Sequence, residues 1–138
     1  MTRSTPIPPA ARFPRTARLR KRVDFDRVYQ QGRRHFGGHL TVFFLRREDG
    51  PQGTAEYTGP RVGFTVGRAL GGAVVRNRIR RRMREAVRRH LAQLQAPVDL
   101  VVHPRKSVLK AQFAELDDEV GRALQAVAAG RGEGRRKE

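Results

Sequence analysis

ALGGAVVRNRIRRRMREAVRRHLAQLQ, residues 69–95, is the stretch that decides the fold. Its apolar residues return every three or four positions, which predicts a long amphipathic helix that begins after the Gly71–Gly72 pair. Pro97 follows the end of this pattern. We expect one side of the helix to face the core, and that side consists of Ile79, Met83, Ala86, Val87, His90, Leu91 and Leu94.

The polar side of this helix carries an unusual positive charge. Residues 76–90 hold eight arginines and one acid, and Arg80, Arg84 and Arg88 follow one flank at four-residue steps. Like charges at this spacing cost roughly 0.2–0.5 kcal/mol per pair, so a polyanionic partner that relieves the repulsion is the favoured interpretation. The alternative is an arginine-rich solvent face in a basic protein. Residues 91–138 disfavour it, because they hold eight basic and seven acidic residues.

Periodicity predicts the elements on both sides of this helix. The predicted elements are a helix at 21–32, strands at 39–47 and 61–68, a buried strand at 98–104 and a helix at 108–128. The order is therefore helix, two or three strands, helix, strand, helix. With three strands before the long helix it becomes α-β-β-β-α-β-α, an α/β (α+β) sandwich with helices packed on a small mixed sheet.

Length and composition set limits on organisation and location. The 138 residues suit one domain. We predict a disordered basic tail at 1–17, a single folded domain at 18–129 and a disordered basic end at 130–138. The absence of cysteine excludes disulfides, zinc ribbons and thiol chemistry. No apolar run approaches the ~20 residues of a membrane span, and the N-terminus has no secretory signal, so we expect a cytoplasmic protein.

Charge and aromatic residues together indicate a nucleic-acid partner. The net charge is +17, and arginine, whose planar fork suits phosphate oxygens, supplies 26 of the 30 basic residues. Phe25 and Tyr29 lie one turn apart on the first predicted helix, and Phe43 and Phe44 point to opposite faces of the next strand. Phe25, Tyr29 and one phenylalanine could line a groove that holds single-stranded nucleic acid. Ordinary core packing is the alternative for each ring.

Several motifs, in this order of elements, resemble the bacterial ribonuclease P protein family. The long helix contains an Ala-Val-x-Arg-Asn-Arg core followed by further basic residues. The first helix contains an Asp-Phe-x-x-Val-aromatic pattern, and a Val-Gly-x-x-Val strand precedes the long helix. The resemblance covers about residues 19–128. The matching residues are Ala73, Val74, Arg76, Asn77 and Arg78; Asp24, Phe25, Val28, Tyr29 and Gly32; and Val62, Gly63 and Val66.

The resemblance implies a fold, partners and a set of contact residues. The family fold joins parallel strands through the Arg-Asn-Arg helix by a left-handed crossover, against the usual preference. The family's protein binds a catalytic RNA that removes the 5′ leader of precursor tRNA with Mg²⁺, and no obligate protein partner is implied. By position, the leader cleft would consist of Phe25, Tyr29 and Phe43. The RNA-binding residues would be Arg68, Arg76, Asn77, Arg78, Arg80, Arg81, Arg84 and Arg88.

One departure from the family pattern affects this surface. Many relatives have two consecutive lysines after the second clear strand, where this chain has Arg68 and Ala69. One cation is therefore missing at that point, and the details of leader contact depend on other residues.

The sequence contains no catalytic constellation of its own. A two-metal nuclease needs several converging carboxylates, but only Glu115 and Glu119 of the acidic cluster at 115–119 share a helix face, which we interpret as solvated. Ser107 suits an N-cap of the last helix, and His90 and His103 suit packing. We therefore expect no catalytic or metal-binding residue in the protein and expect RNA to hold the Mg²⁺. A ribosomal-type RNA-binding protein and a stand-alone nuclease are the alternatives.

Overall fold

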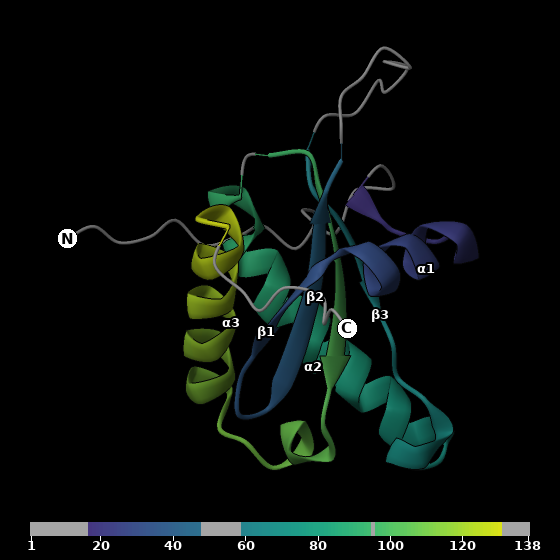
Figure 1. Ribbon diagram of the computed structural model, residues 1–138. Coiled ribbons are helices and arrows are strands. Elements are labelled where there is room, and N and C mark those ends of the chain that lie inside the picture. The colour runs from purple at the N-terminus through teal and green to yellow at the C-terminus, as the bar shows by residue number, and fades with distance from the viewer. Residues whose placement is uncertain (1–16, 48–58, 95, 131–138) are drawn as a thin grey trace, which may run out of the picture.

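The computed structural model describes residues 17–47, 59–94 and 96–130 (Figure 1). Its elements follow the predicted order α-β-β-β-α-β-α, and the predicted α+β class is confirmed. The predicted long helix occupies its expected position. The elements are α1 Arg22–Gln31, β1 Arg33–Phe36, β2 Leu40–Arg46, β3 Arg61–Phe64, α2 Ala73–His90, β4 Val98–Pro104 and α3 Phe113–Ala128.

The four strands form one mixed sheet in the order β1-β2-β4-β3. β2 is antiparallel to both β1 and β4, whereas β3 is parallel to β4. The chain passes from β3 to β4 through α2, as the resemblance implied, and the left-handed sense of that connection stays a prediction. β4 has neighbours on both sides and helices on both faces, which explains its nearly continuous apolar sequence.

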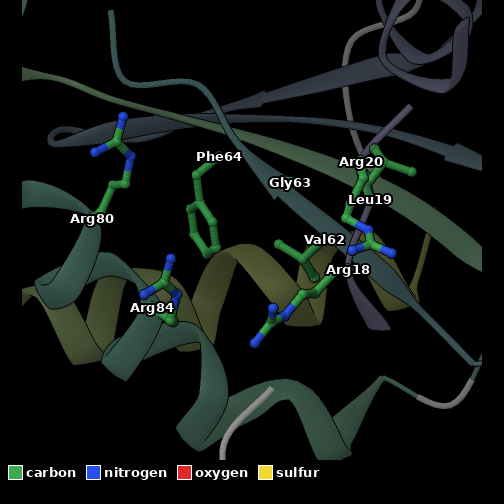
Figure 2. A pocket seen from close by; sticks show the side chains of 8 residues that line it. All are labelled: Arg18, Leu19, Arg20, Val62, Gly63, Phe64, Arg80 and Arg84. Carbon is green, nitrogen blue, oxygen red and sulfur yellow. The ribbon is translucent and has the colours of Figure 1, made fainter. Parts of the chain in front are cut away.

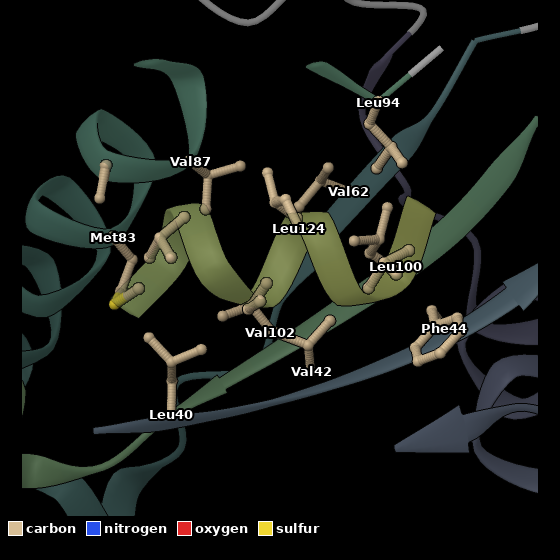
Figure 3. Close-up of a cluster of buried hydrophobic side chains, with 14 of the residues drawn as sticks. Leu40, Val42, Phe44, Val62, Met83, Val87, Leu94, Leu100, Val102 and Leu124 are labelled. Atoms are coloured by element: carbon tan, nitrogen blue, oxygen red, sulfur yellow. The ribbon is translucent and has the colours of Figure 1, made fainter. Parts of the chain in front are cut away.

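The main core lies between the sheet and the pair α2 and α3 (Figure 3). Met83 and Val87 of α2 and Leu124 of α3 meet strand side chains that point to the same face, such as Val42 and Val102. The predicted stripe of α2 is confirmed, because its aliphatic residues from Ile79 to Val87 are buried. Within the described ranges, none of the helices is long and apolar enough to cross a bilayer.

α1 covers the opposite face of the sheet (Figure 1). The hydrophobic cluster on this face is much smaller than the main core. Leu19, Val28 and Val101 are buried there, and Phe43 packs against them. Phe44 lies in the main core, so the prediction that these neighbouring phenylalanines point to opposite faces is confirmed. Val23 differs from the periodicity of α1, because it is exposed.

The segment before α1 belongs to the fold. Ala17 is fully buried in the main core, which corrects the predicted boundary of the tail at residue 17. Arg18 forms a parallel bridge with Val62, and the Leu19 backbone N–H donates to the Val62 carbonyl at 3.0 Å. Residues 18 and 19 thus follow the outer edge of β3. The rest of the predicted tail and residues 131–138 of the predicted C-terminal end lie outside the described residues.

Three boundaries differ from the sequence prediction. α2 ends at His90 and a short 3₁₀ helix, Leu91–Gln93, follows it, although the apolar spacing predicted one helix that continued toward residue 95. β3 ends at Phe64 rather than near residue 68, although the Thr65 N–H still donates to the Val102 carbonyl at 3.0 Å. α3 begins at Phe113, after a short 3₁₀ helix at Lys106–Leu109. Ser107 is therefore not the N-cap of α3. Its hydroxyl lies 2.7 Å from Nδ1 of His39, a contact that local sequence cannot reveal.

Candidate nucleic-acid interface

The arginines of α2 fall on two flanks because the helix packs on the core along its apolar stripe. Arg80 and Arg84 face the edge of β3. Arg78 and Arg81 line a second hollow of about 400 Å³ together with Phe113 of α3. The structure thus places four of the predicted contact residues in two pairs, and each pair faces a different neighbouring element.

The β3 flank forms a pocket of about 300 Å³, which we call the arginine pocket (Figure 2). Arg80 and Arg84 enter it from α2, and residues 18–20 lie on its other side, with Val62 and Phe64 between them. No acidic residue lines it within the described parts of the chain. Its lining is Arg18, Leu19, Arg20, Val62, Gly63, Phe64, Arg80 and Arg84.

Arg18 and Arg20 are functional candidates that the sequence analysis missed. They precede α1, and we assigned them no role because nothing local relates them to α2. The edge pairing with β3 brings them opposite Arg80 and Arg84. The only signal in the sequence was the run of basic residues at 18–22.

The electrostatics of the pocket favour an anion. The pKa of Arg84 is lowered, first by burial and then by the positive charges of Arg18 and Arg80. The side chain of Asn77 orients Arg80, because its Oδ1 accepts a hydrogen bond from Nη1 of Arg80 at 2.9 Å. An oxyanion placed among these guanidinium groups would relieve their repulsion and accept their N–H donors.

The other predicted contact residues have different surroundings. Arg68 is exposed in a short 3₁₀ helix, Arg68–Leu70, just before α2. Nε of Arg76 donates to the Gly71 carbonyl at 3.1 Å, and Gly71 has a φ of 139° that favours glycine. Arg88 pairs with Glu85, and its side chain is 18% exposed. Arg88 is therefore less available to a ligand than the exposed Arg68, Arg78 and Arg81.

Three rings meet on the α1 face of the sheet, and we call them the aromatic cluster: Tyr29, Phe43 and His103. The ring centroids of Tyr29 and Phe43 lie 5.1 Å apart, and those of Phe43 and His103 lie 5.0 Å apart. The Tyr29 hydroxyl lies 2.7 Å from Nε2 of His103 and 2.9 Å from Oγ1 of Thr65. This cluster contains two of the three residues predicted for the leader cleft.

His103 was interpreted from the sequence as a packing residue, but it is a member of this cluster. It follows the apolar part of β4 and projects to the α1 face, opposite Thr41 of β2. Burial lowers its pKa, so the neutral imidazole is favoured. The neutral ring can accept a hydrogen bond from Tyr29, and the pair can orient the exposed edge of the tyrosine.

Phe25, the third predicted cleft residue, is half-buried and packs over β3. A Cβ atom at Gly63 would lie 2.4 Å from Cζ of Phe25, so only glycine leaves room for this ring. Tyr29, at 36% exposure, presents more of its surface to solvent. The structure thus combines both interpretations of the aromatic residues, with Phe25 mainly in packing and Tyr29 at the surface.

Most of the described acidic residues make structural contacts, and Asp26 on α1 is exposed. Asp24 is buried and pairs with Arg27 at 3.2 Å. Glu119 is also buried, which corrects the solvated-face interpretation, and it accepts the backbone N–H of His39 at 2.8 Å. His90 contacts Asp117 at 2.9 Å and packs between helices as predicted. In the described ranges, no group of three or more His, Asp or Glu side chains could hold a metal ion.

Comparison with known proteins supplies independent information. The family model described as ribonuclease P matches residues 13–128. The ribonuclease P protein component of Brucella melitensis is 41% identical over 123 residues, which cover 87% of this chain and 86% of that protein. The component of Acidothermus cellulolyticus is 41% identical over 112 residues, which cover 81% of this chain and 88% of that protein.

Solved structures share the fold. The RNase P protein of Thermotoga maritima has a TM-score of 0.65 at 27% identity, and the match covers 78% of this chain and 94% of that one. The RNase P protein of Staphylococcus aureus has a TM-score of 0.67 at 24% identity, and the match covers 83% of this chain and 98% of that one. The identity to the second structure is low, so that likeness concerns the fold alone.

Proposed function

Because the chain belongs to the ribonuclease P protein family, we propose that it works as the protein subunit of a ribonuclease P ribonucleoprotein. Its partners are the catalytic RNA and the 5′ leader of precursor tRNA. The subunit promotes Mg²⁺-dependent endonucleolytic removal of the leader, which matures the 5′ end of tRNA. The holoenzyme is the endoribonuclease, and the protein is an accessory subunit in the cytoplasm with no obligate protein partner.

The arginine pocket is the observation that carries this proposal. It gathers four guanidinium groups without an acidic lining residue in the described structure. A backbone phosphate of the catalytic RNA would supply the missing negative charge. The exposed Arg78 and Arg81 extend the same contact to the other flank of α2. The assigned contact residues are Arg18, Arg20, Arg68, Arg76, Asn77, Arg78, Arg80, Arg81, Arg84 and, with the smallest share, Arg88.

The aromatic cluster provides a different kind of contact. Tyr29 is exposed, Phe43 is half-exposed and their rings are in edge contact, so bases of a single strand can stack there without strict sequence readout. We assign this surface to the 5′ leader. Phe25 supports this surface by packing between α1 and β3, where its ring fills the space over Gly63.

Bond cleavage is assigned to the RNA subunit. Most described carboxylates pair with arginine, histidine or backbone groups, as Asp99 does with Arg47 and Arg61, and no three of the described His, Asp and Glu side chains converge on one point. The residues present therefore do not fit a protein-held pair of magnesium ions, and phosphate oxygens of RNA suit this hard cation. The protein's contribution is to reduce phosphate repulsion and to position the leader.

One reconstitution experiment tests the proposal against its alternatives. Precursor tRNA is incubated at low Mg²⁺ with the protein, with the catalytic RNA, or with both, and leader release is measured. We expect efficient release only when both are present. Cleavage by the protein alone would indicate a stand-alone nuclease. A mixture no more active than the RNA alone would favour a structural RNA-binding protein.

A further inference from the structure

Exposed aromatic rings are rare in the described part of the molecule. Of its large apolar side chains, four are exposed, and two of these are aromatic: Tyr29 at 36% and Phe36 at 52%. Tyr29 belongs to the aromatic cluster, whereas Phe36 ends β1, the strand at the edge of the sheet. Phe36 belongs to neither hydrophobic cluster. Packing therefore does not explain a phenylalanine at this position.

The strand register places Phe36 on the same face of the sheet as the aromatic cluster. Phe36 is opposite Thr41, and Thr41 is opposite His103. Side chains opposite each other across neighbouring strands point to the same face. Phe36, Thr41 and His103 thus form a row across the sheet, with His103 in the cluster at one end and the exposed ring at the other.

Arg34 connects the two aromatic sites. It is opposite Phe43 in the register of β1 and β2. Its guanidinium carbon lies 5.4 Å from the centroid of the Phe36 ring, in cation–π geometry. It has no acidic partner in an ion pair within the described ranges. A cation beside an exposed ring offers both of the contacts that single-stranded nucleic acid needs, a stacking surface and a charge for the phosphate.

We propose that Phe36 and Arg34 form an outer platform that stacks a further base of the single-stranded RNA held by the aromatic cluster. This inference rests on the proposed function for the identity of that RNA as the 5′ leader. The outer platform extends the binding surface from β4, across β2, to the outer strand β1. The leader then crosses the strands of the sheet rather than ending at Phe43.

The distance between the two ends of the row predicts which nucleotide of the leader stacks on the outer platform. Neighbouring strands are about 4.8 Å apart, so the two intervals from β4 to β1 span about 10 Å. Stacked nucleotides advance by about 3.4 Å along a strand, and extended ones by more. The outer platform therefore lies two or three nucleotides beyond the base at the aromatic cluster. Leaders too short to reach it gain nothing from Phe36.

A series of leader lengths tests this directly. Holoenzyme assembled with the wild-type protein or with Phe36→Ala is titrated with precursor tRNAs whose leaders grow one nucleotide at a time. We expect equal affinity for short leaders and, beyond a threshold length, a loss of about fivefold or more for the alanine variant. Phe36→Tyr, which keeps the stacking surface, should restore the affinity. Val23→Ala removes another exposed apolar side chain, on α1, and should behave as wild type at every length.

Fluorescence supplies a readout at the site itself. The chain has no tryptophan, so Phe36→Trp introduces a single reporter. In the holoenzyme, a long-leader precursor should quench this fluorescence, whereas mature tRNA and a short-leader precursor should leave it unchanged. Val23→Trp serves as the matched reporter away from the row, and its signal should be insensitive to leader length.

The outcomes separate this inference from the proposed function. The outer platform is ruled out if the Phe36→Ala holoenzyme binds precursors of every leader length with wild-type affinity. It is also ruled out if this variant weakens the binding of mature tRNA and of precursor tRNA equally. A change of oligomeric state with unchanged leader affinity would also overturn it and would assign Phe36 to a protein contact. Failure of the proposed function appears elsewhere, in the reconstitution experiment, as leader release that does not rise when wild-type protein is added to the catalytic RNA at low Mg²⁺.

Discussion

The face of the sheet under α2 and α3 holds twenty buried apolar residues in one cluster, whereas the buried cluster under α1 has three. Two helices cover the first face, and one helix of ten residues covers the second. As a result, the side chains on the first face are almost all buried. The second leaves the aromatic cluster and the polar groups of Thr65 and His103 near the surface.

The two faces of the sheet therefore differ in how much of the core they hold, and the proposed recognition surface lies on the face with the smaller cluster. Alternate residues of the same strand serve the two purposes, as Phe44 lies in the main core and Phe43 in the aromatic cluster. The proposed single-strand binding surface therefore takes no side chain from the main core. The arginine pocket, at the edge of β3, connects the two faces because it includes residues of both α2 and the segment before α1.

The largest expected effect is on folding. Leu100→Ala should reduce the free energy of unfolding by about 2–5 kcal/mol, because the side chain is fully buried and its neighbours cannot fill the cavity. Val102→Ala and Val101→Ala form a matched pair on opposite faces of β4. We expect the larger decrease in the free energy of unfolding for Val102→Ala, because Val102 lies in the main core and Val101 in the smaller cluster. Urea denaturation measures all three. Equal losses for the valine pair would contradict the comparison of the two faces.

Binding of the catalytic RNA should depend on the arginine pocket. The double variant Arg80→Ala/Arg84→Ala is expected to weaken it on the order of a hundredfold, with about a tenfold loss for each charge-assisted contact. With roughly six phosphates neutralised, log K against log salt should have a slope of about −4 to −5, and the variant should lower its magnitude by about 2. Filter binding over a salt series measures both.

The control for this variant is Arg122→Ala on α3, whose guanidinium pairs with Asp118 far from the pocket in sequence. It should leave the affinity and the salt slope unchanged. A salt slope that is the same in the double variant and the wild type would remove the electrostatic basis of the pocket.

Recognition of the leader should depend on the aromatic cluster by a smaller factor. Tyr29→Ala is expected to weaken binding of precursor tRNA to the holoenzyme by about tenfold, because one base loses its stacking partner. Mature tRNA should bind as before. Tyr29→Phe keeps the ring and should retain most of the affinity, although it loses the hydrogen bonds to Thr65 and His103. Equal losses for both tRNAs would mean that the ring only packs.

The smallest effect concerns pH. Burial lowers the pKa of His103 below its ordinary value of 6.5, so the unfolded chain takes up a proton more readily than the native one. The contribution of the neutral ring to stability is present above pH 6.5 and is lost as the pH falls through the lowered native pKa. His103→Gln should therefore reduce the loss of stability between pH 7.5 and pH 5.5 in urea denaturation. An unchanged loss would show that other groups cause it.

Much of the fold was predictable, because the spacing of apolar residues along the sequence indicates which side of a helix or strand is buried. The stripe of α2 predicted its start after Gly72 and its buried residues from Ile79 to Val87, but not its end at His90. The end of α1 before Gly32 was predicted correctly. A third strand before the long helix was included in the predicted order, but its position at β1 was not predicted. Arg33–Phe36 has no apolar alternation and is partly exposed at the edge of the sheet. The start of α3 was placed too early, because the 3₁₀ helix at Lys106–Leu109 carries a similar apolar spacing.

The candidate site was predictable where one element holds it. The arginines of α2 follow from a helical wheel, and the pair Phe25 and Tyr29 follows from the spacing of α1. Arg18, Arg20, His103 and Phe36 could not be found in this way. Each acquires its role from a strand pairing with a distant part of the chain, and strand register cannot be deduced from a single short segment.

The amino-acid sequence by itself determined the charge of the molecule, the helix that carries most of the contact arginines and the apolar residues that bury it. These properties are local, because composition and helical periodicity act within a few turns. Only the tertiary structure decided which cations and which rings meet. Edge pairing at β3 placed Arg18 opposite Arg84, and the register of β1, β2 and β4 aligned Phe36 with His103. Such convergence depends on the geometry of the whole sheet, which no single segment encodes.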